Sequence, residues 1–393
     1  MMMGRGPLRV LAADDSAVMR GVMRSLFLAH AEDANGLPPM ALCGVARDGV
    51  ECMEAVAKLR PDVLVLDLEM PRLDGLGVLE RLRHERSRLP VIMCSSHTEH
   101  GARTTLEALA LGATDYVMKP SGQRDLGSAM ASLTEQLLPR IAALARCAAS
   151  RVFSSSGTRQ VHKGKIQGGG LVEVVVIGLS TGGPSALERM LPELPKDLPA
   201  PILIVQHMPK LFTGALAERL DKICALRVEE AYEGAEVRPG TVWLAPGDSH
   251  MELTMRGGFG LGERNVPRVR LHQQAPLNHC RPSVDYLFHS AARFYGAGTL
   301  ALMMTGMGSD GLDGARAVHE RGGAVLAQDE ATSAVWGMPG RVAEAGIASA
   351  TLPLEMLAGE VKARVAVGRA GGDLLLAQAK VIGIRREVTN GLF

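Results

Sequence analysis

The chain has 393 residues, of which 47% are hydrophobic and 22% charged, so its length suits two or three domains with sizeable apolar cores. A formal net charge of +1 and an aromatic content of 3% argue against broad electrostatic binding to nucleic acid or an anionic membrane, and against a stacking platform for bases. The opening segment, MMMGRGPLRVLAADDS, lacks the apolar region of a secretory signal, and the longest apolar runs are far too short to span a membrane. We therefore expect a cytoplasmic protein that binds no nucleic acid and does not insert into a membrane.

The cysteine pattern agrees with a reducing compartment. The cysteines are scattered and no two form a CxxC pair, so we expect free thiols. They are Cys43, Cys52, Cys94, Cys147, Cys224 and Cys280.

The first third of the chain alternates strand and helix signals. Strands are predicted in LRVLAADDS, ALCGVA, DVLVLDLEM, PVIMCSS and TDYVMKP, and helices in SAVMRGVMRSLFLAH, GVECMEAVAKL and TTLEALALGA. Ser16 is the expected N-cap of the first helix, and Gly112 the expected C-cap of the last. The apolar stripe of the first helix consists of Val18, Met19, Val22, Met23, Leu26 and Phe27. Alternating strands and helices predict a parallel sheet that is covered on both faces.

The rest of the chain divides into a helix, a linker, a second alternating region and a tail. A helical pattern from about Leu126 to Leu144 precedes SRVFSSSGTRQVHKGKIQGGG, whose serine, glycine and basic residues predict a flexible linker. The second alternating region begins at Val172, and the final segment has no assignment. The predicted divisions are a first domain at 7–124, a helix and linker at 125–170, a second domain at 171–365 and a tail at 366–393.

Polar side chains end several strands of the first domain. Asp14 and Asp15 end the first strand, Asp67 the third, Ser95 the fourth and Lys119 the fifth. Because ligands gather at the carboxyl ends of parallel strands, the carboxylates should lie together and repel one another unless a cation joins them. Oxygen ligands suit Mg²⁺. Taken singly, each acid is better explained as a solvated turn residue or a helix cap, but the five positions together favour a site.

These residues make the first domain resemble a two-component receiver domain. The matching segments are DD at 14–15, DLEMPRLDG at 67–75, SS at 95–96 and YVMKP at 116–120. The resemblance implies that a histidine kinase transfers a phosphoryl group to Asp67. The implied Mg²⁺ ligands are Asp14, Asp15, Asp67 and the backbone carbonyl of Glu69. The residues implied to respond to the phosphoryl group are Ser95 and Tyr116, which move, and Lys119, which contacts a phosphoryl oxygen.

The second domain opens with an apolar strand and a glycine-rich loop, VVVIGLSTGG. The loop lacks the GxGxxG of a dinucleotide site, the GK[ST] ending of a P-loop and the GxSxG of the usual nucleophile elbow. It still has the parts of an elbow, with an exposed Ser180 before a helix that begins near Pro184. From this loop alone, a nucleophilic Ser180 and a mere helix cap at Ser180 or Thr181 are equally good interpretations.

A serine nucleophile needs a base and an acid that orients it. His207 follows the apolar run APILIVQ, and Asp310 follows TLALMMTGMGS, so both stand where a parallel sheet would collect them beside Ser180. The glycines beside Asp310, in TGMGSDG, let the backbone approach a substrate closely, although the segment also suits a plain turn. The rival histidines, none of which directly follows an apolar strand, are His250, His272, His279 and His289.

Together these segments resemble the catalytic domain of the chemotaxis-type protein-glutamate methylesterases. The match includes IGLSTGGPSAL, QHMP, RPSVDYLF, TGMGSDG and QDEATSAVWGMP, and the order of receiver, linker and esterase domain is that of the family. Leu179 stands where the family's loop has alanine, for which we expect a small packing change. The resemblance implies Ser180 as nucleophile, His207 as general base and Asp310 as its orienting acid. It also implies an oxyanion hole from the backbone N–H groups of Thr181 and Met307.

The expected fold is two doubly wound parallel α/β domains, a flavodoxin-like receiver followed by a larger Rossmann-like three-layer esterase domain. The resemblance implies a monomeric hydrolase, activated by phosphorylation, that removes γ-methyl groups from glutamates on chemoreceptor cytoplasmic helices and deamidates receptor glutamines. Its implied partners are a histidine kinase and methylated chemoreceptors, and its only cofactor is Mg²⁺ at the receiver. Rival hypotheses are a catalytically silent adaptor, a regulator of a pathway other than motility, a small-molecule esterase and a DNA-binding regulator. The last is disfavoured, because the output region is too long for a compact basic helix-turn-helix.

Overall fold

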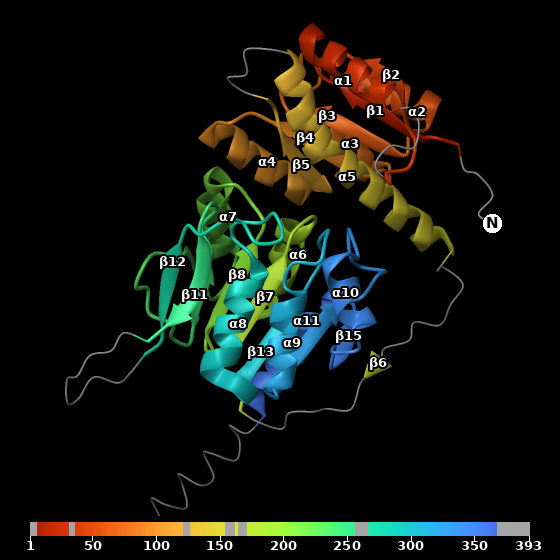
Figure 1. The fold of residues 1–393 in the computed structure, drawn as a ribbon. Coiled ribbons are helices and arrows are strands. Elements are labelled where there is room, and N and C mark those ends of the chain that lie inside the picture. The colour runs from red at the N-terminus through yellow and green to blue at the C-terminus, as the bar shows by residue number, and fades with distance from the viewer. Residues whose placement is uncertain are drawn as a thin grey trace, which may run out of the picture.

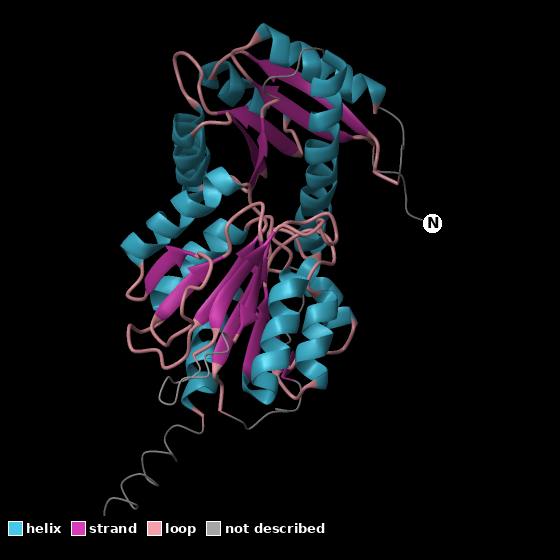
Figure 2. Ribbon diagram, turned by 60° about the vertical axis from the view of Figure 1, so that its left-hand side comes forward, coloured by secondary structure: helices cyan, strands magenta, loops and turns pink. Residues whose placement is uncertain are grey.

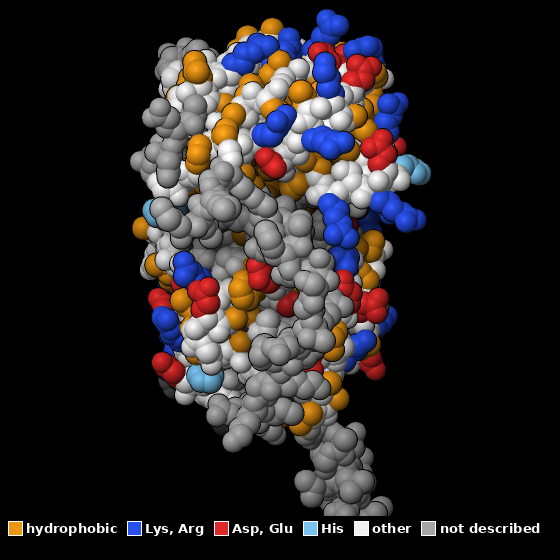
Figure 3. Space-filling view, turned by 90° about the vertical axis from the view of Figure 1, so that its right-hand side faces the viewer, with side chains coloured by type: hydrophobic (Ala, Val, Ile, Leu, Met, Phe, Trp, Pro, Cys, Tyr) orange, Lys and Arg blue, Asp and Glu red, His pale blue; other side chains and the backbone are white. Residues whose placement is uncertain are grey.

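A computed structural model of the chain describes residues 6–30, 36–120, 126–153, 162–163, 171–255 and 266–367, and Figure 1 shows how they are arranged. Two α/β domains lie one above the other, and each is built on its own sheet. Within the described residues, no helix has both the length and the apolar character needed to cross a membrane. On the side of the molecule drawn in Figure 3, basic and acidic side chains are interspersed over both domains, in keeping with the small net charge.

The receiver sheet is wholly parallel, with the order β2-β1-β3-β4-β5. Its strands are β1 (Leu8–Ala13), β2 (Met40–Ala46), β3 (Val63–Asp67), β4 (Val91–Ser95) and β5 (Asp115–Met118). Its helices are α1 (Ala17–Ala29), α2 (Gly49–Leu59), α3 (Gly75–His84), α4 (Glu99–Leu111) and α5 (Leu126–Phe153). Side chains alternate between the two faces of the sheet, so Val10 packs with α1 and α5 while Leu11 packs with α2, α3 and α4.

The local signals at the ends of the receiver helices are confirmed. Ser16 Oγ accepts a hydrogen bond from Met19 N at 3.3 Å at the start of α1, and Gly112 ends α4 with a φ of 122°. The predicted apolar stripe is buried at four of its positions, but Val18 is 69% exposed. Val18 lies on the same side of the helix as the buried Val22, one turn earlier. It is exposed because it lies in the first turn of α1, at the end of the buried stripe.

The second domain is a three-layer structure on a sheet with the order β6-β15-β14-β13-β7-β8-β10-β9. The parallel strands are β7 (Val174–Leu179), β8 (Ile202–Gln206), β9 (Arg227–Glu230), β10 (Thr241–Leu244), β13 (Thr299–Met303), β14 (Ala324–Gln328) and β15 (Ala350–Leu352). Its helices are α6 (Gly183–Met190), α7 (Lys210–Ile223), α8 (Val284–Tyr295), α9 (Leu312–Glu320), α10 (Met338–Glu344) and α11 (Leu354–Ala366), with 3₁₀ turns at Leu191–Glu193 and Gly296–Gly298. The prediction of two doubly wound parallel sheets is confirmed.

The order of the strands fixes where a ligand belongs. From β7, the strands β8, β10 and β9 are added on one side of the sheet, and β13, β14 and β15 on the other. The topological switch point therefore lies between β7 and β13. In such sheets, ligands usually bind in the crevice outside the carboxyl ends of the strands at this point. Figure 2 shows the loops at this edge facing the receiver domain, and α4 packs there against α6 and α7.

The structure differs from the sequence-based expectation in three segments. The helix expected to end near Leu144 continues as α5 to Phe153, and β6 (His162–Lys163) pairs antiparallel with β15 inside the predicted linker. An antiparallel hairpin of β11 (His250–Thr254) and β12 (Arg268–His272) was not predicted. The other predicted linker residues, 154–161 and 164–170, lie outside the described residues, as does the tail from 368 onward.

Candidate active site and phosphoacceptor site

Ser180 lies directly after β7, in a loop whose backbone is held from three sides. Its N–H donates to Thr305 O at 3.0 Å, and its carbonyl accepts from Gln206 Nε2 at 2.9 Å and Gly183 N at 2.8 Å. A Cβ on Gly183 would lie 1.8 Å from Gln206 Oε1, so a larger residue would have to displace the buried amide that holds the Ser180 carbonyl. Leu179, the departure from the family loop, is fully buried in the core.

The helix-cap interpretation of this loop is wrong. The N-cap of α6 is Gly182, at a φ of 77°, and it makes no side-chain cap hydrogen bond. The hydroxyl of Thr181 instead donates to Asp115 Oδ2 of the receiver domain at 2.7 Å. Ser180 therefore has no capping duty.

His207 and Asp310 meet as the strand order predicts. His207 follows β8, Asp310 lies beyond β13, and His207 Nε2 donates to Asp310 Oδ2 at 2.8 Å. Asp310 also accepts from Ser283 Oγ at 2.6 Å, Val284 N at 2.6 Å and Asn278 Nδ2 at 3.1 Å. Four donors thus fix both carboxylate oxygens of a side chain that is 2% exposed.

The electrostatics of the pair follow from these contacts. Burial alone would raise the pKa of Asp310, but its hydrogen bond to His207 and its other donors lower that pKa below the ordinary value. Burial alone would lower the pKa of His207, but the hydrogen bonds with Asp310 and Cys280 outweigh it and raise the pKa to about 9. Asp310 therefore stays ionised and stabilises the imidazolium form of His207.

The second nitrogen of His207 faces a thiol. Nδ1 lies 3.6 Å from Cys280 Sγ. Because Nε2 donates to Asp310, Nδ1 is the nitrogen that loses its proton, and so gains a lone pair, when the ring becomes neutral. In the described part of the chain, Ser180 Oγ makes no hydrogen bond to His207. The structure thus brings His207 and Asp310 into contact and places Ser180 at the same sheet edge without bonding it to them.

The backbone N–H groups of Thr181 and Met307 have no hydrogen-bond partner among the described residues. Both residues lie close to the contact between the domains. Thr181 is 4% exposed and bonded to Asp115, and Met307 packs against the apolar cluster that α1 and α5 share with Val335.

The rival histidines have other partners or face solvent. His250 is fully buried, with Nε2 3.2 Å from Ala275 O, and His272 Nε2 lies 3.4 Å from Glu252 Oε2. His279 and His289 are exposed. None of the four makes a hydrogen bond to Asp310 in the described structure.

The acidic cluster of the receiver forms around Lys119. Lys119 Nζ lies 2.6 Å from Asp67 Oδ2 and 3.1 Å from Asp14 Oδ2, and both carboxylates are 3% exposed, so neither is a solvated turn residue. Asp15 is exposed. Burial first, and then the charge of Asp14, raise the pKa of Asp67 to about 6, although Lys119 opposes the shift.

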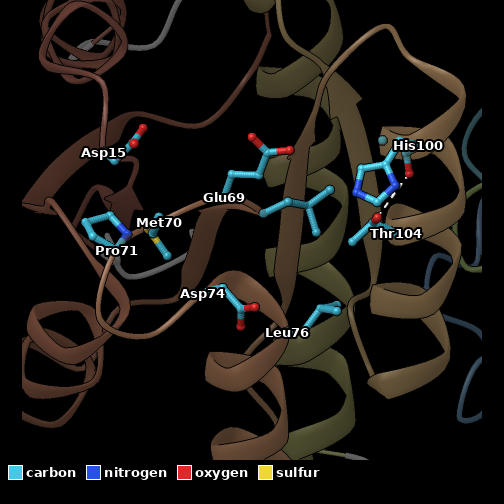
Figure 4. Close-up of a pocket in the computed structure, with 10 residues that line it drawn as sticks. Asp15, Glu69, Met70, Pro71, Asp74, Leu76, His100 and Thr104 are labelled. Carbon is cyan, nitrogen blue, oxygen red and sulfur yellow. Dashed lines mark hydrogen bonds between the residues drawn. The ribbon is translucent and has the colours of Figure 1, made fainter.

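These residues fit a hard divalent cation. Ligand oxygens of Asp14, Asp15 and Asp67 lie within 4.8 Å of one another, and the buried Asp14 Oδ2 has the ion pair with Lys119 but no well-aligned hydrogen bond. A pocket of about 530 Å³ opens beside them, with Asp15, Glu69, Asp74 and His100 in its wall (Figure 4). Oxygen ligands from carboxylates that repel one another suit Mg²⁺.

The two remaining receiver residues face different surroundings. Ser95 is fully buried and its Oγ accepts a hydrogen bond from Thr105 Oγ1 on α4 at 2.7 Å. The ring of Tyr116 stacks on Phe212 of α7, with 4.5 Å between ring centroids and 19° between planes. Tyr116 is therefore part of the contact between the domains.

That contact combines apolar packing with a few polar bonds. Buried side chains of α4, α6 and α7 belong to one apolar cluster that runs through both domains. Ser185 Oγ on α6 donates to Leu109 O at the end of α4 at 2.9 Å. Arg103 Nη2 on α4 lies 3.4 Å from Glu218 Oε2 on α7.

Comparison with known proteins identifies the family of each domain. The family model described as CheB methylesterase matches residues 175–361, and that of the response regulator receiver domain matches residues 10–131. The chain is 44% identical to a protein-glutamate methylesterase/protein-glutamine glutaminase of Nocardioides sp. over 91% of this chain and 96% of the relative. The chain belongs to the CheB methylesterase family.

Other members are similarly related. A protein-glutamate methylesterase/protein-glutamine glutaminase of Trichodesmium erythraeum is 40% identical over 91% of this chain and 99% of its own length. The crystal structure of the Thermotoga maritima CheB methylesterase catalytic domain is 43% identical, with a TM-score of 0.46, over 48% of this chain and 97% of that one.

Sequence reasoning gave no role to the residues that support Asp310, although RPSVDYLF was part of the family match. Asn278, Cys280 and Ser283 come from the stretch between β12 and α8, and they reach Asp310 and His207 only in the folded chain. The one available signal was the run NHCRPSVD, in which several polar residues directly precede an amphipathic helix. Asp115, which bonds Thr181 across the domains, gave no signal beyond its place at the start of a strand.

Proposed function

We propose that the chain is a phosphorylation-activated protein-glutamate methylesterase, with Ser180 as nucleophile, His207 as general base and Asp310 as the residue that orients His207. The substrate is a glutamyl γ-methyl ester on the cytoplasmic helices of a chemoreceptor. Family membership supports the activity, since relatives that match most of the chain are named protein-glutamate methylesterase/protein-glutamine glutaminase.

One observation carries the residue roles. A hydroxyl, an imidazole and a carboxylate follow three neighbouring strands at the switch point of the sheet, and the imidazole and carboxylate are 2.8 Å apart. This is the functional-group set of a serine hydrolase at the sheet edge where ligands bind.

The first half of the reaction forms an acyl-enzyme. His207 Nδ1 accepts the proton of Ser180 as Oγ attacks the ester carbonyl, and Asp310 holds Nε2–H and stabilises the imidazolium. For this step Ser180 Oγ must approach Nδ1, which in the resting structure contacts Cys280. The unbonded N–H groups of Thr181 and Met307 are the donors for the tetrahedral oxyanion.

The second half restores the enzyme. The imidazolium gives its proton to the departing methoxy group, and methanol leaves. Water, deprotonated by His207, then attacks the acyl carbon, and a free glutamate remains with Ser180 reprotonated. The same acyl transfer with an ammonia leaving group deamidates glutamine. Each turnover adds one negative charge to a receptor helix.

The receiver domain is the regulator. Asp67 accepts a phosphoryl group from a histidine kinase, Lys119 contacts a phosphoryl oxygen, and Asp14, Asp15, Asp67 and the carbonyl of Glu69 would hold Mg²⁺. Bound there, Mg²⁺ supplies neutralising charge for the phosphoryl oxygens. Ser95 and Tyr116 respond to the phosphoryl group, and Tyr116 is already in contact with Phe212 of the esterase domain. We place the protein in the cytoplasm as a monomer.

The test is release of labelled methanol from methylated receptor membranes, with and without acetyl phosphate. Ser180→Ala should lower the rate by more than about 10⁴-fold, because loss of a serine nucleophile removes the acyl-enzyme route. Ser349→Ala is the matched control, since Ser349 bonds Val325 at the other end of the sheet and its loss should leave the rate unchanged.

Wild-type turnover in Ser180→Ala would refute the nucleophile assignment. A folded wild type that binds receptor but releases no methanol, with or without phosphodonor, would favour the silent adaptor. Hydrolysis of small esters without action on receptor would favour the small-molecule esterase.

A further inference from the structure

The side chain of Cys280 is held in place against His207 by a tight turn. Leu277 and Cys280 exchange both backbone hydrogen bonds, at 3.1 and 2.9 Å, and the two residues between them, Asn278 and His279, have φ angles of 52° and 62°. A turn closed this way fixes the direction in which Cys280 points. The thiol is half-buried and free of any disulfide, and its Sγ lies 3.6 Å from His207 Nδ1.

This geometry is that of two neighbouring metal ligands. A tetrahedral Zn²⁺, with Zn–S and Zn–N bonds of about 2.3 and 2.0–2.1 Å, holds its sulfur and nitrogen ligands about 3.5 Å apart. The sulfur and nitrogen here already have that separation, and Nδ1 is the ring atom that holds the lone pair once the imidazole is neutral. A metal ion between them would need little movement of either side chain.

The surroundings of the imidazole also match a metal site. A metal-bound histidine usually donates its other ring N–H to a carboxylate, which fixes the ring and raises its basicity. His207 Nε2 donates to Asp310 in this way at 2.8 Å, and three further donors hold Asp310 in turn. Ligand atoms of His207, Cys280 and Asp310 all lie within 4.8 Å of one another.

We propose that Cys280 Sγ and His207 Nδ1, with Asp310 behind the imidazole, form a binding site for a thiophilic divalent cation such as Zn²⁺. Binding releases the proton of the thiol and the Nδ1 proton of the imidazolium, so that the thiolate and the neutral imidazole are the ligands and water completes the coordination. Under the proposed function, Nδ1 is the base, so an ion bound there prevents it from accepting the proton of Ser180. Zn²⁺ is therefore a reversible inhibitor of the esterase.

Ligand chemistry separates this site from the receiver site. Sulfur and imidazole ligands favour Zn²⁺ over Mg²⁺, whereas the carboxylates of Asp14, Asp15 and Asp67 suit Mg²⁺. The two cations thus have opposite effects on one chain, with Mg²⁺ serving activation and Zn²⁺ blocking the catalytic base.

The full-length protein can be titrated with Co²⁺, whose bond to a thiolate gives an intense near-ultraviolet charge-transfer band that oxygen ligands do not give. We expect the wild type to develop this band at one equivalent and to lose it when Zn²⁺ is added. Cys280→Ser should not develop the band. Cys224→Ser, which alters another half-buried thiol of the same domain, should behave as the wild type.

Inhibition is measured on the same proteins, each relative to its own metal-free rate of methanol release. Zn²⁺ should inhibit the wild type, a chelator should restore it, and Cys280→Ser should need about tenfold more Zn²⁺ or more for half-inhibition. A band that survives in Cys280→Ser, or its absence from the wild type, overturns the proposal. The band is read without substrate, so an intact band in a chain without esterase activity would count against the proposed function alone.

Discussion

Asp310 joins more of the site than any other side chain described above. Its two oxygens accept hydrogen bonds from a histidine, a serine, an asparagine and a backbone N–H, although the side chain is almost fully buried. A buried carboxylate with this many donors stays ionised at neutral pH and raises the pKa of the imidazole beside it.

Asp310→Asn should therefore lower kcat/KM by about 10²–10⁴-fold and change its pH dependence. In the wild type, His207 becomes a base only as pH rises through its raised pKa, so the acidic limb lies above 6.5, toward about 9. Without the carboxylate that pKa falls, and the limb should move to lower pH. A pH profile of kcat/KM for both proteins measures the shift.

Asp313→Asn is the control for this experiment. Asp313 is an exposed residue of α9 that pairs with Arg316, so its substitution should leave both rate and limb unchanged. An acidic limb that stays in place in Asp310→Asn would show that the ionisation belongs to a group other than His207.

The proposed phosphoacceptor is likewise a single side chain, that of Asp67. Asp67→Asn should abolish labelling by acetyl phosphate, because Asp67 is the carboxylate paired with Lys119 at 2.6 Å. EDTA should abolish labelling of the wild type, since Mg²⁺ is needed to neutralise the site. Asp62→Asn, in which the altered residue precedes β3 at the opposite end of the strand, is the control. Labelling that persists after both treatments would place the phosphoacceptor elsewhere.

At the scale of elements, three helices connect the two sites. The receiver's α4 packs on α6, which follows Ser180, and on α7, which begins three residues after His207. Phe212 of α7 stacks on Tyr116 of β5, so a movement of that ring would act directly on the helix that follows His207, the proposed base. The loops that carry Ser180 and His207 are thus held from the receiver side by ordinary helix packing.

Ser185→Ala tests this contact with little disturbance of the site. It removes the hydrogen bond from α6 to Leu109 O of the receiver. A hydrogen bond contributes about 0.5–1.5 kcal/mol, so resting methylesterase activity should rise roughly 2- to 12-fold while the activity of phosphorylated protein stays the same. An equal rise in both states would mean that the substitution alters catalysis and not the domain contact.

At the scale of the whole molecule, the receiver covers the carboxyl edge of the esterase sheet (Figure 1). Of the proposed oxyanion donors, Thr181 bonds Asp115 of the receiver, and Met307 packs against the apolar cluster that the receiver shares with Val335. A domain tethered by a short linker stays at high effective concentration near its partner, so even a modest interface can keep the edge covered and still release it.

A fragment without the receiver should therefore be more active than the unphosphorylated full-length chain and should not respond to phosphodonor. A coupling free energy of about 1–3 kcal/mol corresponds to a difference of roughly 5- to 150-fold. The fragment should begin ahead of His162, because β6 pairs with β15 and belongs to the esterase sheet. Methanol release by the two proteins gives the ratio. A fragment less active than the resting chain would mean that the receiver activates by contact.

The amino-acid sequence alone determined the features that follow from local patterns and from the residues at strand ends. Apolar runs alternating with helical stripes predicted two parallel sheets. Because ligands gather at the carboxyl ends of parallel strands, the sequence also predicted that Asp14 lies near Asp67 and His207 near Asp310, as the structure shows. Ser16 and Gly112 marked helix ends for reasons that lie within a few residues of each.

The tertiary structure alone decided which distant side chains meet. Cys280 and Asn278 contact His207 and Asp310, and Asp115 bonds Thr181 across the domains, through pairings of residues that lie far apart in the chain. No periodicity records such pairings, because a turn or a strand end has the same local pattern whatever it later packs against. The same reason left β6 unpredicted, since two residues become a strand only when β15 offers its edge.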